Sequence, residues 1–113
     1  MKISTRQSGQ TIILDLEGKI DLQTSPIFRK ALFEALSAEP IVIVNFQRVQ
    51  YVDSSGIASM AEGYQHAKKL EKRILLFGLV SMVRNVLDLT HLSRIFEIFE
   101  TEEQALKAAS PKS

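Results

Sequence analysis

The segment Asp53–Gly56 holds the side chains best suited to chemistry in this sequence. It has the sequence Asp-Ser-Ser-Gly and lies between an apolar, β-branched stretch and a stretch with the apolar spacing of an amphipathic helix. One interpretation is a helix cap, a position that favours Asp and Ser. The other is a modification site, because unpaired N–H groups and the helix dipole stabilise a phosphate at a helix N-terminus. The residues alone leave both interpretations open.

A second polar position, Asp21, interrupts apolar residues and precedes Thr24, Ser25 and Pro26. A turn or an early helix cap would explain it. A site is the alternative, because loops that follow strands gather at one end of a mixed sheet. We therefore expect Asp21 and Asp53 to lie near each other.

Common enzyme signatures are missing from the sequence. It contains neither G-x-x-x-x-G-K nor G-x-G-x-x-G. A hydrolase nucleophile elbow needs glycine two positions before its serine, where this chain has Val52 or Asp53. His66 and His91 are not spaced as a metal pair; we expect His66 on the exposed side of a helix and His91 in a loop. We predict a protein that is not an enzyme and needs no metal or other cofactor.

Composition narrows the class of protein further. The 113 residues suit one domain, and the absence of cysteine excludes disulfides and thiolate chemistry. The 14 basic and 13 acidic side chains give a net charge of +1, too little to attract nucleic acid or an anionic membrane. No apolar run is long enough to span a bilayer, and the first residues lack a secretory signal. We therefore expect a cytoplasmic location.

Apolar periodicity predicts an α/β fold with a mixed sheet of about five strands and about four helices packed on it. The expected strands cover residues 2–6, 11–17, 41–46, 74–77 and 95–99, the first two forming an antiparallel hairpin. The expected helices cover residues 25–37, 54–72, 81–88 and 101–109. Their expected caps are Thr24 or Ser25, Ser54 or Ser55, and Thr101. Gly18 should end the second strand, and Tyr51 and Val52 should lie in a loop. Residues 1–109 form the expected domain and 110–113 a frayed tail.

Four segments resemble the STAS domain family, and specifically its bacterial anti-sigma factor antagonists. The segments Gly18–Pro26 and Val49–Ala58 resemble the two family motifs that precede the first and second helices. The segments Val83–Phe96 and Glu102–Leu106 resemble the closing part of the domain. The match runs in order along nearly the whole chain. Asp-Ser-Ser-Gly is its most specific motif.

The resemblance implies a regulatory switch. Such proteins bind an anti-sigma factor that is also a serine kinase with a histidine-kinase-like ATPase fold, and thereby release the sigma factor. The kinase phosphorylates the second serine of the motif, which corresponds to Ser55, and the antagonist then lets go. A metal-dependent serine phosphatase restores the first state. The implied partner-binding residues are Asp21, Thr24, Asp53, Ser54 and Gly56.

Other members of this broad family have different partners. A STAS-like chain can be the small accessory subunit of a lipid-transport ABC complex or a scaffold in a signalling assembly. The complete Asp-Ser-Ser-Gly motif favours the switch. Direct nucleotide binding has no motif in this sequence to support it.

Overall fold

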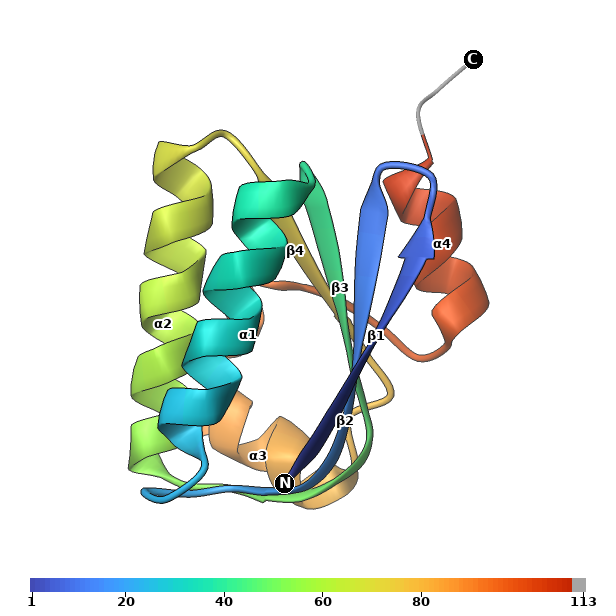
Figure 1. The fold of residues 1–113 in the computed structure, drawn as a ribbon. Coiled ribbons are helices and arrows are strands. Elements are labelled where there is room, and N and C mark those ends of the chain that lie inside the picture. Colours follow the sequence, from blue (N-terminus) through green and yellow to red (C-terminus); the bar gives the residue numbers. More distant parts are fainter. Residues whose placement is uncertain (111–113) are drawn as a thin grey trace.

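The computed structural model describes residues 1–110, which form one five-stranded sheet with helices on both faces (Figure 1). The strands are β1 (Lys2–Ser8), β2 (Thr11–Ile20), β3 (Ile41–Val52), β4 (Arg73–Phe77) and β5 (Glu97–Phe99). The helices are α1 (Ser25–Ala38), α2 (Ser54–Lys69), α3 (Ser81–Leu89), the 3-10 turn η1 (Leu92–Arg94) and α4 (Glu102–Ala109). The predicted α/β class, with five strands and four α-helices, is confirmed.

The sheet has the order β1-β2-β3-β4-β5, in which only β1 is antiparallel to its neighbour. The expected hairpin joins β1 and β2 through a tight turn in which Gly9 has a φ of +60°. Because β2, β3 and β4 are parallel, the loops that follow them lie at one edge of the sheet. This edge carries both polar segments identified in the sequence.

Two strands extend further than the sequence predicted. Gly18 does not end β2; it adopts a φ of +119° within the strand, which continues to Ile20. Tyr51 and Val52 do not lie in a loop, because they pair with Lys19 and Ile20 of β2 and complete β3. Hydrogen-bonded pairing between β2 and β3 continues past Gly18, although glycine locally favours a turn. The pairing fixes the position of β3 up to Val52, the residue before Asp53.

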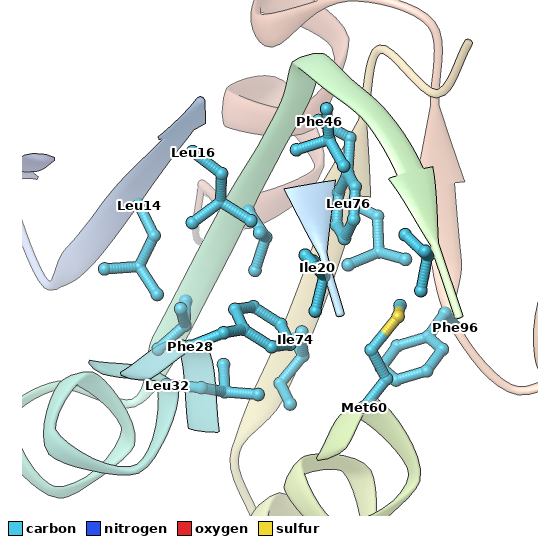
Figure 2. Close-up of a cluster of buried hydrophobic side chains, with 14 of the residues drawn as sticks. Leu14, Leu16, Ile20, Phe28, Leu32, Phe46, Met60, Ile74, Leu76 and Phe96 are labelled. Carbon is cyan, nitrogen blue, oxygen red and sulfur yellow. The ribbon is translucent and has the colours of Figure 1, made fainter. Parts of the chain in front are cut away.

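The main core lies between the sheet and the helices α1, α2 and α3 (Figure 2). Its larger side chains include Leu14, Ile20, Phe28, Leu32, Phe46, Met60, Leu76 and Phe96. A smaller apolar cluster lies on the other face of the sheet, where α4 covers it (Figure 1). It consists of Ile13, Ile43, Leu75, Phe77, Ala105 and Ala109. Because apolar clusters lie on both faces of the sheet, the central strands β3 and β4 are buried on both faces.

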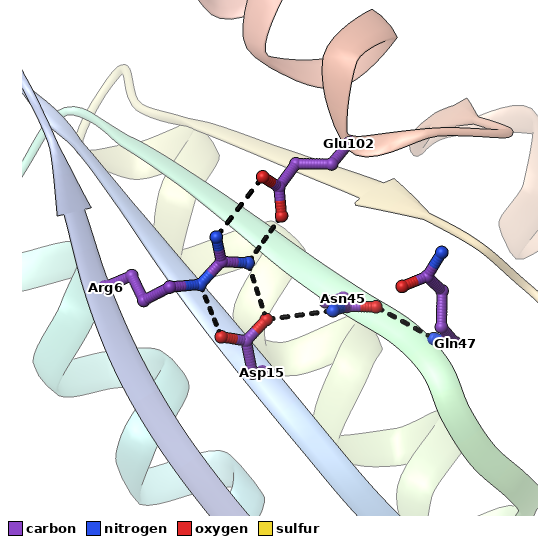
Figure 3. A network of polar contacts seen from close by, with 5 residues as sticks. All are labelled: Arg6, Asp15, Asn45, Gln47 and Glu102. Carbon is purple, nitrogen blue, oxygen red and sulfur yellow. Dashed lines mark hydrogen bonds and ion pairs between the residues drawn. The ribbon is translucent and has the colours of Figure 1, made fainter.

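An ion network attaches the start of α4 to the sheet (Figure 3). The Arg6 guanidinium donates to both carboxylate oxygens of Asp15, at 2.6 and 2.8 Å, and also to the carboxylate of Glu102, at 2.5 and 3.2 Å. Asn45 donates a further hydrogen bond to Asp15 at 2.9 Å. The hydrogen bonds from Arg6 are the main cause of a lowered pKa at Asp15.

Several smaller sequence predictions needed correction. The helix α2 ends at Lys69 rather than residue 72, and β5 begins at Glu97 rather than at residue 95, because a turn through Ile95 and Phe96 follows η1. The imidazole of His66 is half-buried and stacks on Phe33 with ring centroids 4.4 Å apart, so it is not simply solvated. The expected cap at Thr101 is confirmed, since its side chain accepts a hydrogen bond from the N–H of Gln104. Of the expected tail, residues 111–113 lie outside the described residues.

The Asp15–Arg6 pair predicts a specific pH dependence of stability. Because folding lowers the pKa of Asp15, its contribution is fully present above the unfolded-state pKa of about 4 and is lost as the pH falls through the folded-state pKa. We expect Arg6→Met to lower the free energy of unfolding by about 1 kcal/mol at neutral pH, a modest value because the pair is partly exposed. The difference in unfolding free energy between wild type and Arg6→Met should shrink as the pH falls below about 4. Urea unfolding of both proteins from neutral to acidic pH measures this difference, and a pH-independent value would contradict this role of the pair.

Candidate functional site

The carboxylate of Asp53 organises the start of α2. Its Oδ1 accepts hydrogen bonds from the backbone N–H groups of Ser55 and Gly56, at 2.9 and 3.2 Å, and from the Ser55 hydroxyl at 2.5 Å. The N-cap is therefore Asp53, not Ser54 or Ser55 as the sequence predicted. The pKa of Asp53 is lowered, chiefly by the Ser55 hydroxyl, with further contributions from backbone N–H groups. The cap is thus an ionised carboxylate at the positive end of a helix.

The two serines of the segment Asp53–Gly56, which we call the switch segment, differ in accessibility. Ser55 is half-buried and its hydroxyl is held by Asp53. Ser54 is exposed, and within residues 1–110 its hydroxyl makes no hydrogen bond. Because Asp53 is the cap, neither hydroxyl is needed to begin the helix.

Gly56 allows α2 to approach the sheet closely. A Cβ atom at this position would lie 2.7 Å from side-chain carbons of both Ile20 and Val52, which are fully buried. Real Cβ atoms do not make contacts this short. The glycine of the motif therefore has a packing role that is independent of any chemistry.

The loop between β2 and α1 is built around Asp21 and Thr24. The Asp21 Oδ1 accepts hydrogen bonds from the backbone N–H groups of Gln23 and Thr24, at 3.0 and 3.1 Å. The Thr24 hydroxyl donates to the carbonyl of Lys19 at 2.7 Å and accepts from the N–H of Asp21 at 2.9 Å. Thr24 holds the N-cap position of α1, but its side chain makes no capping bond there. Asp21 and Thr24 therefore shape this loop, as the turn interpretation predicted.

The structure brings the two polar segments together, which confirms the expectation from topology. The backbone N–H of Asp53 donates to the carbonyl of Ile20 at 3.0 Å, and the N–H of Leu22 contributes to the lowered pKa of the Asp53 carboxylate. Sequence reasoning overlooked Leu22, whose side chain is 77% exposed beside this cap. A leucine in a polar loop was the signal that could have identified it.

The arrangement suits recognition at a surface. The cavities of about 820 and 340 Å³ lie elsewhere, one between the β1–β2 turn and the end of α4 and the other along β1, β2 and β3. Among residues 1–110, no group of three or more His, Asp or Glu side chains is placed to hold a metal ion. No helix in the described part of the chain has the length and apolar character needed to cross a membrane.

Comparison with known proteins identifies the family. The model of the STAS domain matches residues 2–105, and the chain belongs to the STAS domain family. One relative is the anti-sigma-B factor antagonist of Listeria monocytogenes, 30% identical over 86 residues, which cover 75% of each protein. Another is the anti-sigma F factor antagonist of Paenibacillus polymyxa, 23% identical over 108 residues, which cover 94% of this chain and 92% of the relative.

Solved structures share the fold. An anti-sigma factor antagonist from Mycobacterium paratuberculosis matches with a TM-score of 0.86 and 21% identity, over 95% of this chain and 92% of that one. The unphosphorylated anti-sigma factor antagonist SpoIIAA matches with a TM-score of 0.81 and 22% identity, over 96% of both chains. A sulfate transporter family protein from Wolinella succinogenes also matches, with a TM-score of 0.79 and 17% identity, over 90% of this chain and 86% of that one.

The close packing at Gly56 predicts that Gly56→Ala destabilises the protein. The added methyl group would displace either the helix start or two fully buried side chains, and overpacking of this kind costs about 1–3 kcal/mol. Alanine would gain back only about 1 kcal/mol through helix propensity. Ser54→Ala is the control, because that side chain is exposed. Urea unfolding measures both variants, and a Gly56→Ala variant as stable as wild type would show that the contact relaxes freely.

Proposed function

We propose that this chain is an anti-sigma factor antagonist whose binding to an anti-sigma factor is switched by phosphorylation in the switch segment. The observation that carries the proposal is the pair of serines, Ser54 and Ser55, at the start of a helix that Asp53 already caps. The relatives named anti-sigma factor antagonists support the same function. In this proposal the unmodified chain holds the anti-sigma factor and frees the sigma factor.

The two serines offer different routes to the modified state. The family resemblance assigns the phosphate to Ser55, but that hydroxyl is half-buried and must first leave Asp53. Ser54 is exposed and needs no such rearrangement. We propose Ser55 as the acceptor, as the motif implies, with Ser54 as the alternative that accessibility favours.

A phosphate on Ser55 would add nearly two negative charges at the N-terminus of α2, in place of the hydroxyl that is bonded to Asp53. The helix dipole favours a negative charge at this position and partly offsets its repulsion from the Asp53 carboxylate, so the fold can tolerate the modification. The partner surface, in contrast, would meet a large charged group where it had met a neutral hydroxyl. Each 1.4 kcal/mol of lost interface energy weakens binding tenfold.

The proposed partners supply the chemistry that this chain does not. The kinase is the anti-sigma factor itself, with a histidine-kinase-like ATPase fold that holds the ATP. A metal-dependent serine phosphatase removes the phosphate. Asp21 and Thr24 shape the loop beside the switch segment, and we propose that the loop contacts the kinase together with Asp53, Ser54 and Gly56. The chain acts as a binding protein and substrate of these enzymes, and it needs no cofactor of its own.

Incubation with the cognate kinase and ATP should place one phosphate in the switch segment. We expect Ser55→Ala to abolish phosphorylation and Ser54→Ala to retain it. Peptide mass spectrometry of the wild type and both variants reads out the position. Phosphate on Ser54 alone would contradict the assignment to Ser55, and phosphate only on Thr24 or Ser25 would contradict the proposed switch.

Charge at the acceptor should control affinity. Ser55→Glu supplies part of the phosphate's charge and is expected to weaken binding of the anti-sigma factor by about tenfold or more, whereas Ser55→Ala keeps binding near wild type. Ser54→Glu and Ser54→Ala form the matching pair at the other serine. Calorimetric titration with the purified anti-sigma factor gives the dissociation constants. Equal affinities for the Glu and Ala variants at both positions would exclude a charge switch here.

A subunit of a lipid-transport ABC complex or a signalling scaffold remains the second candidate. The fold does not decide between these functions, because a sulfate transporter family protein shares it. Affinity purification from the native cell distinguishes the candidates by what is retained. A small serine kinase would support the switch, and an ABC ATPase would support the transport complex.

A further inference from the structure

Exposed apolar side chains gather at the edge of the sheet that carries the switch segment. Within residues 1–110, eight large apolar side chains are exposed, and six of them lie at or beyond the carboxyl ends of β2, β3 and β4. These six are Leu22, Ile27, Tyr51, Val80, Met82 and Leu89. Scattered apolar residues need no explanation, but a cluster of this kind is typical of an interaction surface.

The helix α3 contributes a continuous stripe to this cluster. Met82, Val86 and Leu89 follow one another at spacings of four and three residues, which places them on one side of the helix. Met82 is 45% exposed and Leu89 is 81% exposed, Val86 between them is half-buried, and the neighbouring face of the helix is buried in the core through Val83 and Leu87. The core therefore does not account for Met82 and Leu89.

The stripe lies at the same end of the molecule as the switch segment. Figure 1 shows α3 at the end of the sheet where α2 begins. Val83 and Leu87 share the main core with Ile20 and Val52, the two residues that Gly56 approaches. Leu22 lies beside the switch segment, two residues after Ile20, whose carbonyl accepts a hydrogen bond from the backbone N–H of Asp53. We define Leu22, Met82, Val86 and Leu89 as the apolar patch.

We propose that the apolar patch docks an apolar face of the anti-sigma factor, and that phosphorylation releases this partner mainly because a phosphate cannot be desolvated there. The proposal rests on the proposed function and assigns a second contact surface and a physical cause of release. The carboxylates beside the patch do not require a basic partner, because Asp21 and Asp53 accept hydrogen bonds from their own loops. A charge buried against apolar groups without a partner is strongly disfavoured.

A second copy of this chain fits the patch poorly. A stable dimer buries roughly 800 Å² on each partner, more than a few side chains provide. A symmetric pairing would also bring the same surface of both copies together, so that one interface would hold the Asp21 and Asp53 carboxylates of both copies. A different protein avoids both problems, because it can extend its contact over the loop, the switch segment and α3.

The test compares the double variant Met82→Ser/Leu89→Ser with Leu70→Ser. Leu70 is a matched control, since it is 44% exposed but lies at the other end of α2. Titration with the purified anti-sigma factor kinase should show binding about tenfold or more weaker for the double variant and within about twofold of wild type for the control. Urea unfolding checks that both variants fold. Binding of the wild type should change little between about 0.05 and 0.5 M salt.

The outcomes separate this proposal from the proposed function. If the wild type binds no such kinase, both fail. If it binds, and the double variant binds equally well or loses no more affinity than the control, the apolar patch is excluded while the switch stands. A steep loss of wild-type binding with salt would overturn the desolvation mechanism in favour of charge attraction. Sedimentation showing a wild-type dimer that the double variant disrupts would make a second copy the occupant and overturn the proposal.

Discussion

The capping of α2 by Asp53 is the interaction on which the candidate site depends. One carboxylate oxygen accepts two backbone N–H groups and the Ser55 hydroxyl, while the backbone N–H of the same residue is bound to the carbonyl of Ile20. These bonds join the end of β3, the end of β2 and the first turn of α2. A single residue thus fixes both the direction of the helix and the position of the serines that follow it.

Packing beneath the cap completes this constraint. Gly56 lets the first turn of α2 lie directly on Ile20 and Val52, both of which are removed from solvent. The first turn of α2 is therefore packed against the core on the side of Gly56 and exposed to solvent at Ser54. Such a junction leaves Ser54 exposed while Ile20 and Val52 support the first turn of α2 from the core.

The four residues of the switch segment have different structural roles. Asp53 and Gly56 serve the architecture, Ser55 is tied to the cap, and Ser54 is left facing solvent. Asp21 and Thr24 repeat this division in the adjacent loop, where their hydrogen bonds present Leu22 outward. Recognition by a partner, as proposed above, then combines these structural residues with the exposed side chains of Ser54 and Leu22.

The sequence by itself determined the fold class and the identity of the polar segments. Alternating and helical apolar spacings are local properties, so they predicted the hairpin, the buried strand at residues 41–46 and the helices without knowledge of their neighbours. The topology rule for parallel strands also placed Asp21 near Asp53. The full length of β3, the role of Asp53 as the cap and the exposure of Ser54 were decided only by the tertiary structure. Each depends on pairing with β2 or packing against Ile20, contacts between residues distant in sequence, which local propensities do not contain.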